Sequence, residues 1–226
     1  MKLDGNLRLD RYAWAAEIIR ELLPASPAPV VADVGAHGDR MQSAVAVAGG
    51  RWHGFDLVPA SAEVVRWDLN SPAPVDATRP GVVLLMDVIE HLGNPWLAMK
   101  HLASFMLPGA YLVLTTPNPR WSRSRFYELA KGTPNCFTQS DLDLNHHVFP
   151  VWPHIAERLL GDHGLTVERY VTLDGPTRLP DRPFGLRYPL RLAFSVACRA
   201  IERRDPTACG MSFGVIARRR ELPTQE

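Results

Sequence analysis

The sequence predicts an α/β fold, in which helices alternate with the strands of a mostly parallel sheet. Apolar runs at residues 30–34 and 82–86 are separated by stretches with helical spacing, and this alternation is typical of a parallel sheet. Because open α/β sheets bind ligands at the carboxyl ends of their strands, polar residues at those ends indicate an enzyme with a bound cofactor. An aspartate closes or interrupts each early apolar run, at Asp33, Asp56, Asp68 and Asp87.

The N-terminal elements follow from the spacing of apolar residues. Apolar side chains recur at helical intervals up to Leu23 and stop at Pro24, which predicts an amphipathic helix over residues 8–23. We expect this helix to cap the cofactor cleft. The continuous apolar run at 30–34 predicts a buried first strand. It is followed by a helix and three further strands, at residues 41–48, 52–56, 64–67 and 82–86.

The C-terminal half continues the pattern. It predicts a helix, a strand, a second helix and two late strands of β-type composition, at residues 95–106, 111–115, 151–163, 165–171 and 211–217. Between the first of these strands and the second helix, residues 120–131 are basic and aromatic, and residues 133–147 predict a polar loop.

A long insertion, residues 172–209, separates the last two strands. It is far longer than a usual connection, so it should have a structure or function of its own. Four arginines at multiples of four lie beside apolar residues, which predicts a helix with a basic stripe and an apolar face. Three interpretations follow: solvated charge over a helix that packs on the core, a lid that closes the cleft, or a peripheral membrane contact through residues 186–204. The arginines are Arg187, Arg191, Arg199 and Arg203.

Composition narrows the classes of function. The chain has 226 residues, 46% of them hydrophobic, and no linker or abrupt change of charge divides it, so we expect one domain over 1–226 with its cofactor-binding core at 28–171. A formal net charge of +1 gives no global field that would favour nucleic acid. Three widely separated cysteines fit neither a zinc site nor a disulfide framework. No uncharged run approaches the roughly 20 residues that cross a bilayer, and we expect a cytoplasmic protein.

The turn after the first strand should approach a ligand closely. Its sequence is Asp33-Val34-Gly35-Ala36-His37-Gly38, and glycine permits a close approach of the backbone because it lacks a Cβ. A dinucleotide fingerprint would require G-x-G-x-x-G, whereas His37 and Arg40 occupy later glycine positions, which weakens a nicotinamide interpretation. At the end of the second strand, Asp56 can accept hydrogen bonds from both hydroxyls of a ribose.

In combination, these segments resemble the class I S-adenosylmethionine-dependent methyltransferases. Residues 31–36 look like the first motif of that family, Asp56 like its ribose acid, and Asp68-Leu69 like its adenine-site pair. The segment Met86-Asp87-Val88-Ile89-Glu90-His91-Leu92 is similar to that of the ubiquinone-biosynthesis O-methyltransferases. The resemblance implies a Rossmann-like, seven-stranded, mostly parallel sheet with helices on both faces, an N-terminal helix and an inserted helical region before the last strand.

The resemblance also implies S-adenosyl-L-methionine as the cofactor. The residues that match the family's cofactor site are Asp33, Gly35, Ala36, His37, Gly38, Asp56, Leu57, Asp68, Leu69, Asp87 and Val88. The family usually has D-x-G-x-G-x-G, and here His37 and Asp39 replace the second and third glycines. The loop therefore takes a variant path or binds the cofactor with altered affinity.

Three residues after the strand at 82–86 allow two interpretations. Asp87, Glu90 and His91 have the spacing i, i+3, i+4, which would place them on one face of a helical turn. In the first interpretation His91 is a general base, because an imidazole suits proton removal at neutral pH. In the second, the three residues bind a hard divalent cation; we rank the base first, because no further ligands can be identified. From the family's later loop, His146 and His147 are the second acid–base candidates.

The sequence therefore predicts an S-adenosylmethionine-dependent methyltransferase. We expect it to methylate a hydroxyl on a small molecule, a glycan or a lipid-linked intermediate, with no nucleic acid as partner. Two alternatives stay open at this point, an NAD(P)-dependent oxidoreductase and a catalytically silent methyltransferase-like binding domain.

Overall fold

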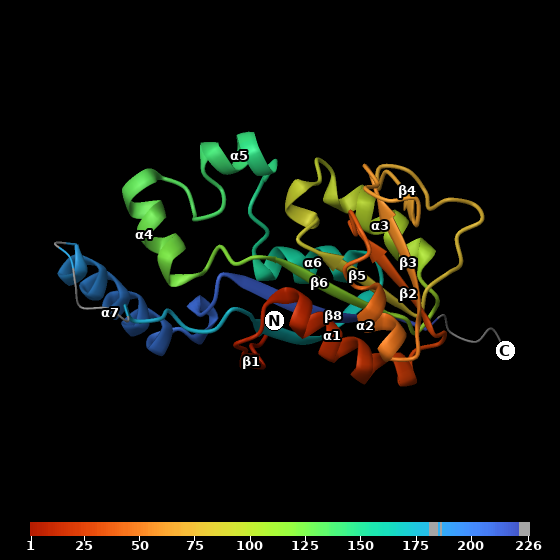
Figure 1. Cartoon of the computed structure of the whole chain (residues 1–226), viewed down its shortest axis with the longest axis horizontal. Coiled ribbons are helices and arrows are strands. Elements are labelled where there is room, and N and C mark those ends of the chain that lie inside the picture. The colour runs from red at the N-terminus through yellow and green to blue at the C-terminus, as the bar shows by residue number, and fades with distance from the viewer. Residues whose placement is uncertain (181–184, 186, 222–226) are drawn as a thin grey trace.

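The computed structural model describes residues 1–180, 185 and 187–221. Their strands form one eight-stranded sheet in the order β1-β7-β8-β6-β5-β2-β3-β4 (Figure 1). Strand β8 runs antiparallel to its neighbours β6 and β7, and the other pairings are parallel. The strands are β1 (Gly5–Asn6), β2 (Val30–Val34), β3 (Arg51–Asp56), β4 (Val64–Arg66), β5 (Val82–Met86), β6 (Tyr111–Pro117), β7 (Leu165–Thr172) and β8 (Ser212–Arg219).

Helices cover both faces of this sheet. Alternate residues of each strand point to opposite faces, so Leu84 and Val113 pack with α1 and α2, whereas Leu85 and Leu114 pack with α3 and α6. Helices α4, α5 and α7 extend away from the sheet at one end of the molecule (Figure 1). The helices are α1 (Arg11–Leu22), α2 (Gln42–Val47), α3 (Pro95–Phe105), α4 (Ser122–Lys131), α5 (Gln139–Asn145), α6 (Pro153–Asp162) and α7 (Tyr188–Arg204).

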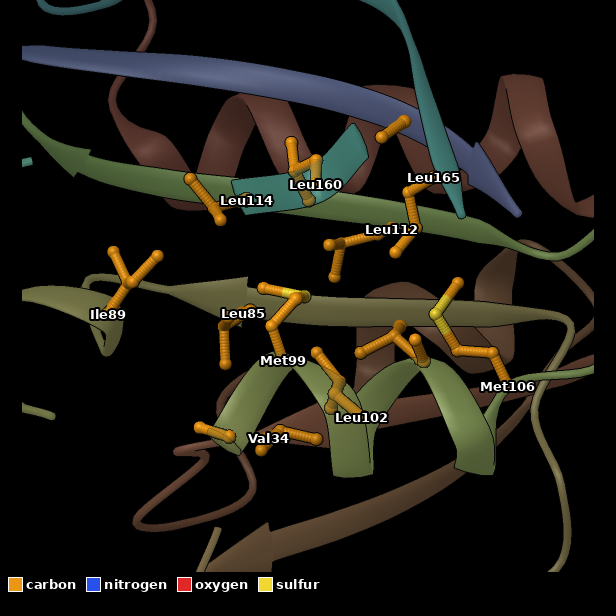
Figure 2. Packing of buried hydrophobic residues seen from close by; sticks show 14 of the residues in the cluster. Val34, Leu85, Ile89, Met99, Leu102, Met106, Leu112, Leu114, Leu160 and Leu165 are labelled. Carbon is orange, nitrogen blue, oxygen red and sulfur yellow. The ribbon is translucent and has the colours of Figure 1, made fainter. Parts of the chain in front are cut away.

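The core beneath α3 fixes the strands that lead into the pocket described below. Figure 2 shows Met99 of α3 and Leu85 of β5 among the side chains that meet between the helix and the sheet, and Leu112 lies on the same side. These three side chains are at most 1% exposed. Truncating such a side chain to alanine costs about 2–5 kcal/mol, so the core holds the carboxyl ends of β5 and β6 in place.

The predicted fold class is confirmed, with differences at the edges. The sheet has eight strands rather than seven, because Gly5–Asn6 pairs with β7; two residues are too few to produce a periodic pattern. The predicted helix at 8–23 begins only at Arg11, since the Asp10 carboxylate caps it by accepting the N–H groups of Tyr12 and Ala13.

Two further segments contain helices that the sequence pattern did not predict. The stretch at 120–131 contains α4. The expected polar loop at 133–147 contains α5, which begins with a capping box between Thr138 and Asp141. Helix α5 buries none of its residues, so it lacks the apolar periodicity by which a helix is recognised. Among the described residues, no helix has the length and apolar character needed to cross a bilayer.

Candidate functional site

A cavity of about 350 Å³ opens at the carboxyl ends of β2, β3 and β5, and we call it the central pocket. Such crevices are where open α/β sheets bind ligands. Most of the predicted site residues reach it from loops that are distant in sequence. Its lining comprises Val34, Gly35, Asp56, Leu57, Trp67, Asp68, Leu69, Asn70, Asp87, Val88, His91, Leu92 and Gly93.

The turn after β2 reaches the pocket through Gly35. Its φ of +81° is in the left-handed region, and a Cβ added there would lie 2.2 Å from Cγ2 of Val88. Glycine is therefore required both by the backbone conformation and by the close approach of the loop after β5. The N–H groups of Gly35 and Ala36 both donate to the carbonyl of Phe55, at 2.8 and 3.1 Å, which ties the turn to β3.

Asp56, at the end of β3, organises the two loops that border the pocket. Its carboxylate accepts the N–H of His37 at 2.8 Å on one oxygen and the N–H of Val58 at 2.8 Å on the other. His37 has a φ of +54°, a strained conformation of the kind that clusters at functional sites. Because each carboxylate oxygen has two lone pairs, Asp56 keeps acceptor capacity for a ligand.

Asp68 and Leu69 border the same pocket on its β4 side. The Asp68 carboxylate accepts the N–H of Asn70 at 2.9 Å, which is a local turn that a short aspartate side chain commonly forms. Leu69 is buried, and Trp67 packs edge-on against Phe55 with ring centroids 5.5 Å apart. The aromatic cluster holds this wall against the sheet while the polar groups stay at the pocket.

Four of the predicted cofactor residues do not line the central pocket. Asp33 is only 3% exposed and accepts the indole N–H of Trp52 at 3.2 Å. Burial raises the pKa of Asp33 to about 6, although the indole hydrogen bond opposes this. Asp33 therefore supports the strand and the turn from beneath. The others, Ala36, His37 and Gly38, lie in the turn behind Gly35.

On the opposite wall, Asp87 is tied to the N-terminal helix. Its carboxylate pairs with the Arg11 guanidinium at 2.7 Å and accepts the Thr115 hydroxyl at 2.7 Å. Its φ of +52° is a second strained conformation at the pocket. The sequence pattern did not predict a role for Arg11. Its contact with Asp87 joins the first turn of α1 to the end of β5, which are far apart in the sequence.

Glu90 is completely buried beside the pocket wall. One carboxylate oxygen, Oε2, accepts the Thr116 hydroxyl at 2.9 Å, whereas the buried Oε1 has no hydrogen-bond partner among the described residues. Burial, reinforced by the charge of Asp87, raises the pKa of Glu90 to about 8. The side chain therefore holds its proton at neutral pH.

His91 and His147 come together although 56 positions separate them in the sequence. Their ring centroids are 4.9 Å apart, and Nδ1 of His147 lies 2.6 Å from the carbonyl oxygen of Cys136. A carbonyl only accepts, so Nδ1 carries a proton and Nε2 of the neutral ring is an acceptor. Burial, followed by the neighbouring His147, lowers the pKa of His91 below its ordinary value.

The histidines and Glu90 also define where a cation could bind. Glu90, His91 and His147 each place one ligand atom within 4.8 Å of the others. The residues close enough to share a cation are therefore Glu90, His91 and His147. Asp87, the third member of the predicted set, pairs with Arg11 instead. His146, the other predicted acid–base residue, is exposed and outside this group.

Comparisons with known proteins identify the fold. The chain resembles a methyltransferase of Archaeoglobus fulgidus that depends on S-adenosylmethionine, with 17% identity, 90% and 94% of the two chains covered and a TM-score of 0.56. For a methyltransferase of Mesorhizobium loti that also depends on S-adenosylmethionine, the values are 16%, 92% and 100%, and 0.52. For geranyl diphosphate C-methyltransferase of Streptomyces coelicolor, in complex with Mg²⁺, geranyl diphosphate and S-adenosyl-L-homocysteine, they are 19%, 92% and 77%, and 0.54.

No curated protein matches the sequence. The model of a family described as a methyltransferase domain matches residues 7–169, which is well over half of the chain and includes every residue of the central pocket. The chain therefore belongs to this methyltransferase domain family, and S-adenosylmethionine is its cofactor.

Proposed function

We propose that the protein transfers the methyl group to a hydroxyl, with His91 as the group that receives the hydroxyl proton. The observation that carries this proposal is that His91 lines the central pocket together with Asp87 and Val88. A base is needed there because an alcohol is only weakly acidic, and positioned bases contribute about 10²–10⁴-fold to rates.

The residues of the central pocket fit the cofactor. Asp56 retains lone pairs that can accept from ribose hydroxyls. Asp68 and Leu69 line the same pocket, which supports their proposed roles toward the adenine amino group and a ring nitrogen. Gly35 lets the turn after β2 pack directly against Val88, because an added Cβ would lie 2.2 Å from Cγ2 of Val88, and both residues line the central pocket. When bound, S-adenosylmethionine supplies a methyl group activated by a sulfonium.

The surroundings of His91 suit proton transfer. Burial and His147 lower the pKa of His91, so the ring is neutral at pH 7 and can accept a proton. Glu90 is neutral at the same pH, since burial raises its pKa to about 8, so it does not trap His91 in the charged form. His147 is a positioning residue, held by the Cys136 carbonyl.

The exposed surface of α7, in the insertion, supports contact with a membrane and hence a lipid-linked acceptor. Helix α7 exposes Leu190 and Val196, which are 74% and 52% exposed, beside Arg187 and Arg191. An apolar and basic surface of this kind supports a peripheral membrane contact. Leu186, at the start of the predicted segment, lies outside the described residues. Cosedimentation with vesicles of phosphatidylcholine and phosphatidylglycerol, compared between wild type and Leu190→Ser/Val196→Ser, tests the contact; equal binding would leave the alternative of a lid.

The test of the reaction uses acceptors that differ only in the nucleophile. Purified protein is given methyl-labelled S-adenosylmethionine with matched series of alcohols, amines and thiols on phenolic, sugar and polyprenyl frameworks. The expected product is a methyl ether. Transfer to amines or thiols with none to the matched alcohols would overturn O-methylation while leaving the family assignment intact.

Addition of a chelator distinguishes a role of His91 as a general base from a role as a ligand of a bound cation. If His91 accepts the proton directly, excess EDTA leaves the rate of methyl transfer unchanged. Loss of activity with EDTA, restored by Mg²⁺ or Zn²⁺, would favour cation binding at Glu90, His91 and His147 instead.

A further inference from the structure

A second hollow lies where the insertion meets the N-terminal segment. One cavity of about 330 Å³ is lined by residues 174–179 with Arg8 and Arg199, and a neighbouring cavity of about 310 Å³ is also lined by Arg8 and Arg199. Because their linings share these arginines and Pro176, the two cavities adjoin, and we treat them as one groove. We call it the arginine groove, after Arg8, Arg178, Arg199 and Arg203 in its walls.

Among the described residues, none of the four guanidinium groups takes part in an ion pair or donates a hydrogen bond. Four like charges around a hollow focus a positive potential into it. The planar fork of arginine matches the oxygens of a phosphate, often with two parallel hydrogen bonds, so the chemistry of the groove suits an anion of this type.

The two acidic residues of the groove accept hydrogen bonds from neutral groups. Glu202 is 7% exposed, and its carboxylate accepts the Ser122 hydroxyl at 2.7 Å, the Thr177 hydroxyl at 2.5 Å and the Thr177 N–H at 3.0 Å. Asp174 accepts the N–H of Ser212 at 3.1 Å. Glu202 thus joins α7, α4 and the segment after β7 into a formed floor, and two carboxylates leave the four arginines in excess.

The groove lies next to the methyl-transfer site. Strands β1 and β7 run parallel to β6. Their carboxyl ends therefore lie along the same side of the sheet as the carboxyl ends that form the central pocket. Arg8 is three residues from Arg11, which pairs with Asp87 in the pocket wall, so the two Cα atoms are at most about 11 Å apart. The carbonyl of Leu9, between them, accepts the N–H of Asp174 at 2.9 Å and fixes this connection.

We propose that the arginine groove binds a phosphate or diphosphate group carried by the methyl acceptor. The acceptor would then bridge two places, with its phosphate in the groove and its nucleophile at the central pocket. This proposal rests on the proposed function, because the ligand is a methyl acceptor only if the protein transfers a methyl group. Binding of phosphate to the groove can be measured without methyl transfer.

The first experiment measures pyrophosphate binding to the full chain by isothermal titration calorimetry at constant ionic strength. We expect binding by wild type, and affinity about tenfold or more weaker in Arg8→Gln/Arg199→Gln, because two charge-assisted contacts are lost. The control is Arg51→Gln/Arg66→Gln, which removes the same charge from exposed positions of β3 and β4 and should bind as wild type does. No binding by wild type, or equal affinity in all three proteins, would overturn the proposal.

S-adenosylhomocysteine binding is measured on the same samples. Unchanged affinity in the groove variant shows that the protein is folded and that the groove is separate from the central pocket. If that variant does not fold, Arg178→Gln, at an exposed position, replaces it. Its affinity for pyrophosphate should also be weaker than that of wild type, by less than in the double variant, because one charge-assisted contact is lost. Phosphate binding without any methyl transfer would refute the acceptor role alone, and methyl transfer without phosphate binding would refute the groove alone.

Competition identifies the source of the phosphate. If glucose 1-phosphate displaces pyrophosphate and vesicles with phosphatidic acid do not, the ligand is a soluble phosphoester. If those vesicles bind wild type but not the groove variant, while phosphatidylcholine vesicles bind neither, the ligand is a lipid headgroup. Displacement by a single-stranded RNA at far lower concentration than either would overturn the proposal in favour of a nucleic acid surface.

Discussion

The two walls of the central pocket are built in different ways. On one wall, which we call the aspartate side, Gly35, Asp56 and Asp68 hold loops through hydrogen bonds to nearby backbone groups, at 2.8–2.9 Å for the two carboxylates. On the other wall, the histidine side, Asp87, Glu90, His91 and His147 depend on contacts between distant segments. The residues proposed to bind the cofactor are therefore held by contacts within neighbouring loops. The residues proposed to act on the acceptor are held by contacts between segments that are far apart in the sequence.

The largest expected effect is on the histidine side. His91→Asn should lower kcat for an accepted alcohol by about 10²–10⁴-fold and leave the affinity for S-adenosylhomocysteine within about twofold. Because its pKa is lowered, wild-type activity should fall only at a pH below the ordinary value for histidine, and this acid limb should vanish in the variant. Steady-state rates across pH measure both, with His154→Asn on the exposed face of α6 as the control.

If kcat of His91→Asn stays within threefold of wild type, the proton goes elsewhere. His147 and His146 would then be tested in the same assay, and the comparison between the two walls would have to be redrawn.

The next effect separates binding from stability on the aspartate side. Asp56→Ala removes the proposed acceptor of two ribose hydroxyls, and each charge-assisted hydrogen bond contributes about 1.5–3 kcal/mol, so the Kd for S-adenosylhomocysteine should rise roughly 10–100-fold. Calorimetry measures this, with the exposed Asp76→Ala as the control. A fall in the unliganded Tm with an unchanged Kd would make Asp56 a structural residue.

A smaller effect tests the contact between the walls. Gly35→Ala should lower the free energy of unfolding by about 1–3 kcal/mol more than Gly49→Ala does. Both glycines have a φ near +80°, but an added Cβ meets Val88 at 2.2 Å in the first and open space in the second. Urea unfolding compares the two variants; equal losses would mean that the backbone conformation alone requires glycine.

The smallest effect concerns the buried acid. Burial raises the pKa of Glu90 from 4.5 to about 8, so its neutral form contributes stability that is complete below pH 4.5 and is lost as pH rises through 8. Glu90→Gln keeps an acceptor for Thr116 and does not ionise, so the difference in Tm between variant and wild type should grow in favour of the variant from pH 5 to pH 9. A constant difference across this range would show that Glu90 is already ionised.

The aspartate side and most of the fold were predictable because their signals are local. Strand β5 was placed at its observed bounds by five consecutive apolar residues, and Asp56 by its position at the end of β3. The contact of Arg11 with Asp87 and the contact of His147 with His91 were not predictable, because each joins segments that are far apart in the sequence. His91 was proposed from its spacing and from imidazole chemistry, whereas His146 and His147 were proposed from the family resemblance. The finer likeness to ubiquinone-biosynthesis enzymes stays a prediction.

Length explains two of the misses in secondary structure, β1 and α5. Strand β1 has two residues and α5 has seven, all of them outside the core, so neither produces an apolar period. Their positions are fixed by pairing with β7 and by a capping box, which act through hydrogen bonds rather than hydrophobic pattern.

The central claim is that S-adenosylmethionine binds in the pocket between these walls, and thermal unfolding with competing cofactors tests it most directly. Saturation with S-adenosylhomocysteine at ~100 times its Kd should add about 2.7 kcal/mol to the free energy of unfolding, a rise in Tm of several degrees for a domain of this size. This rise should be absent with NAD(H) and reduced in Asp56→Ala at the same ligand concentration. A rise with NAD(H) and none with S-adenosylmethionine or S-adenosylhomocysteine would contradict the account.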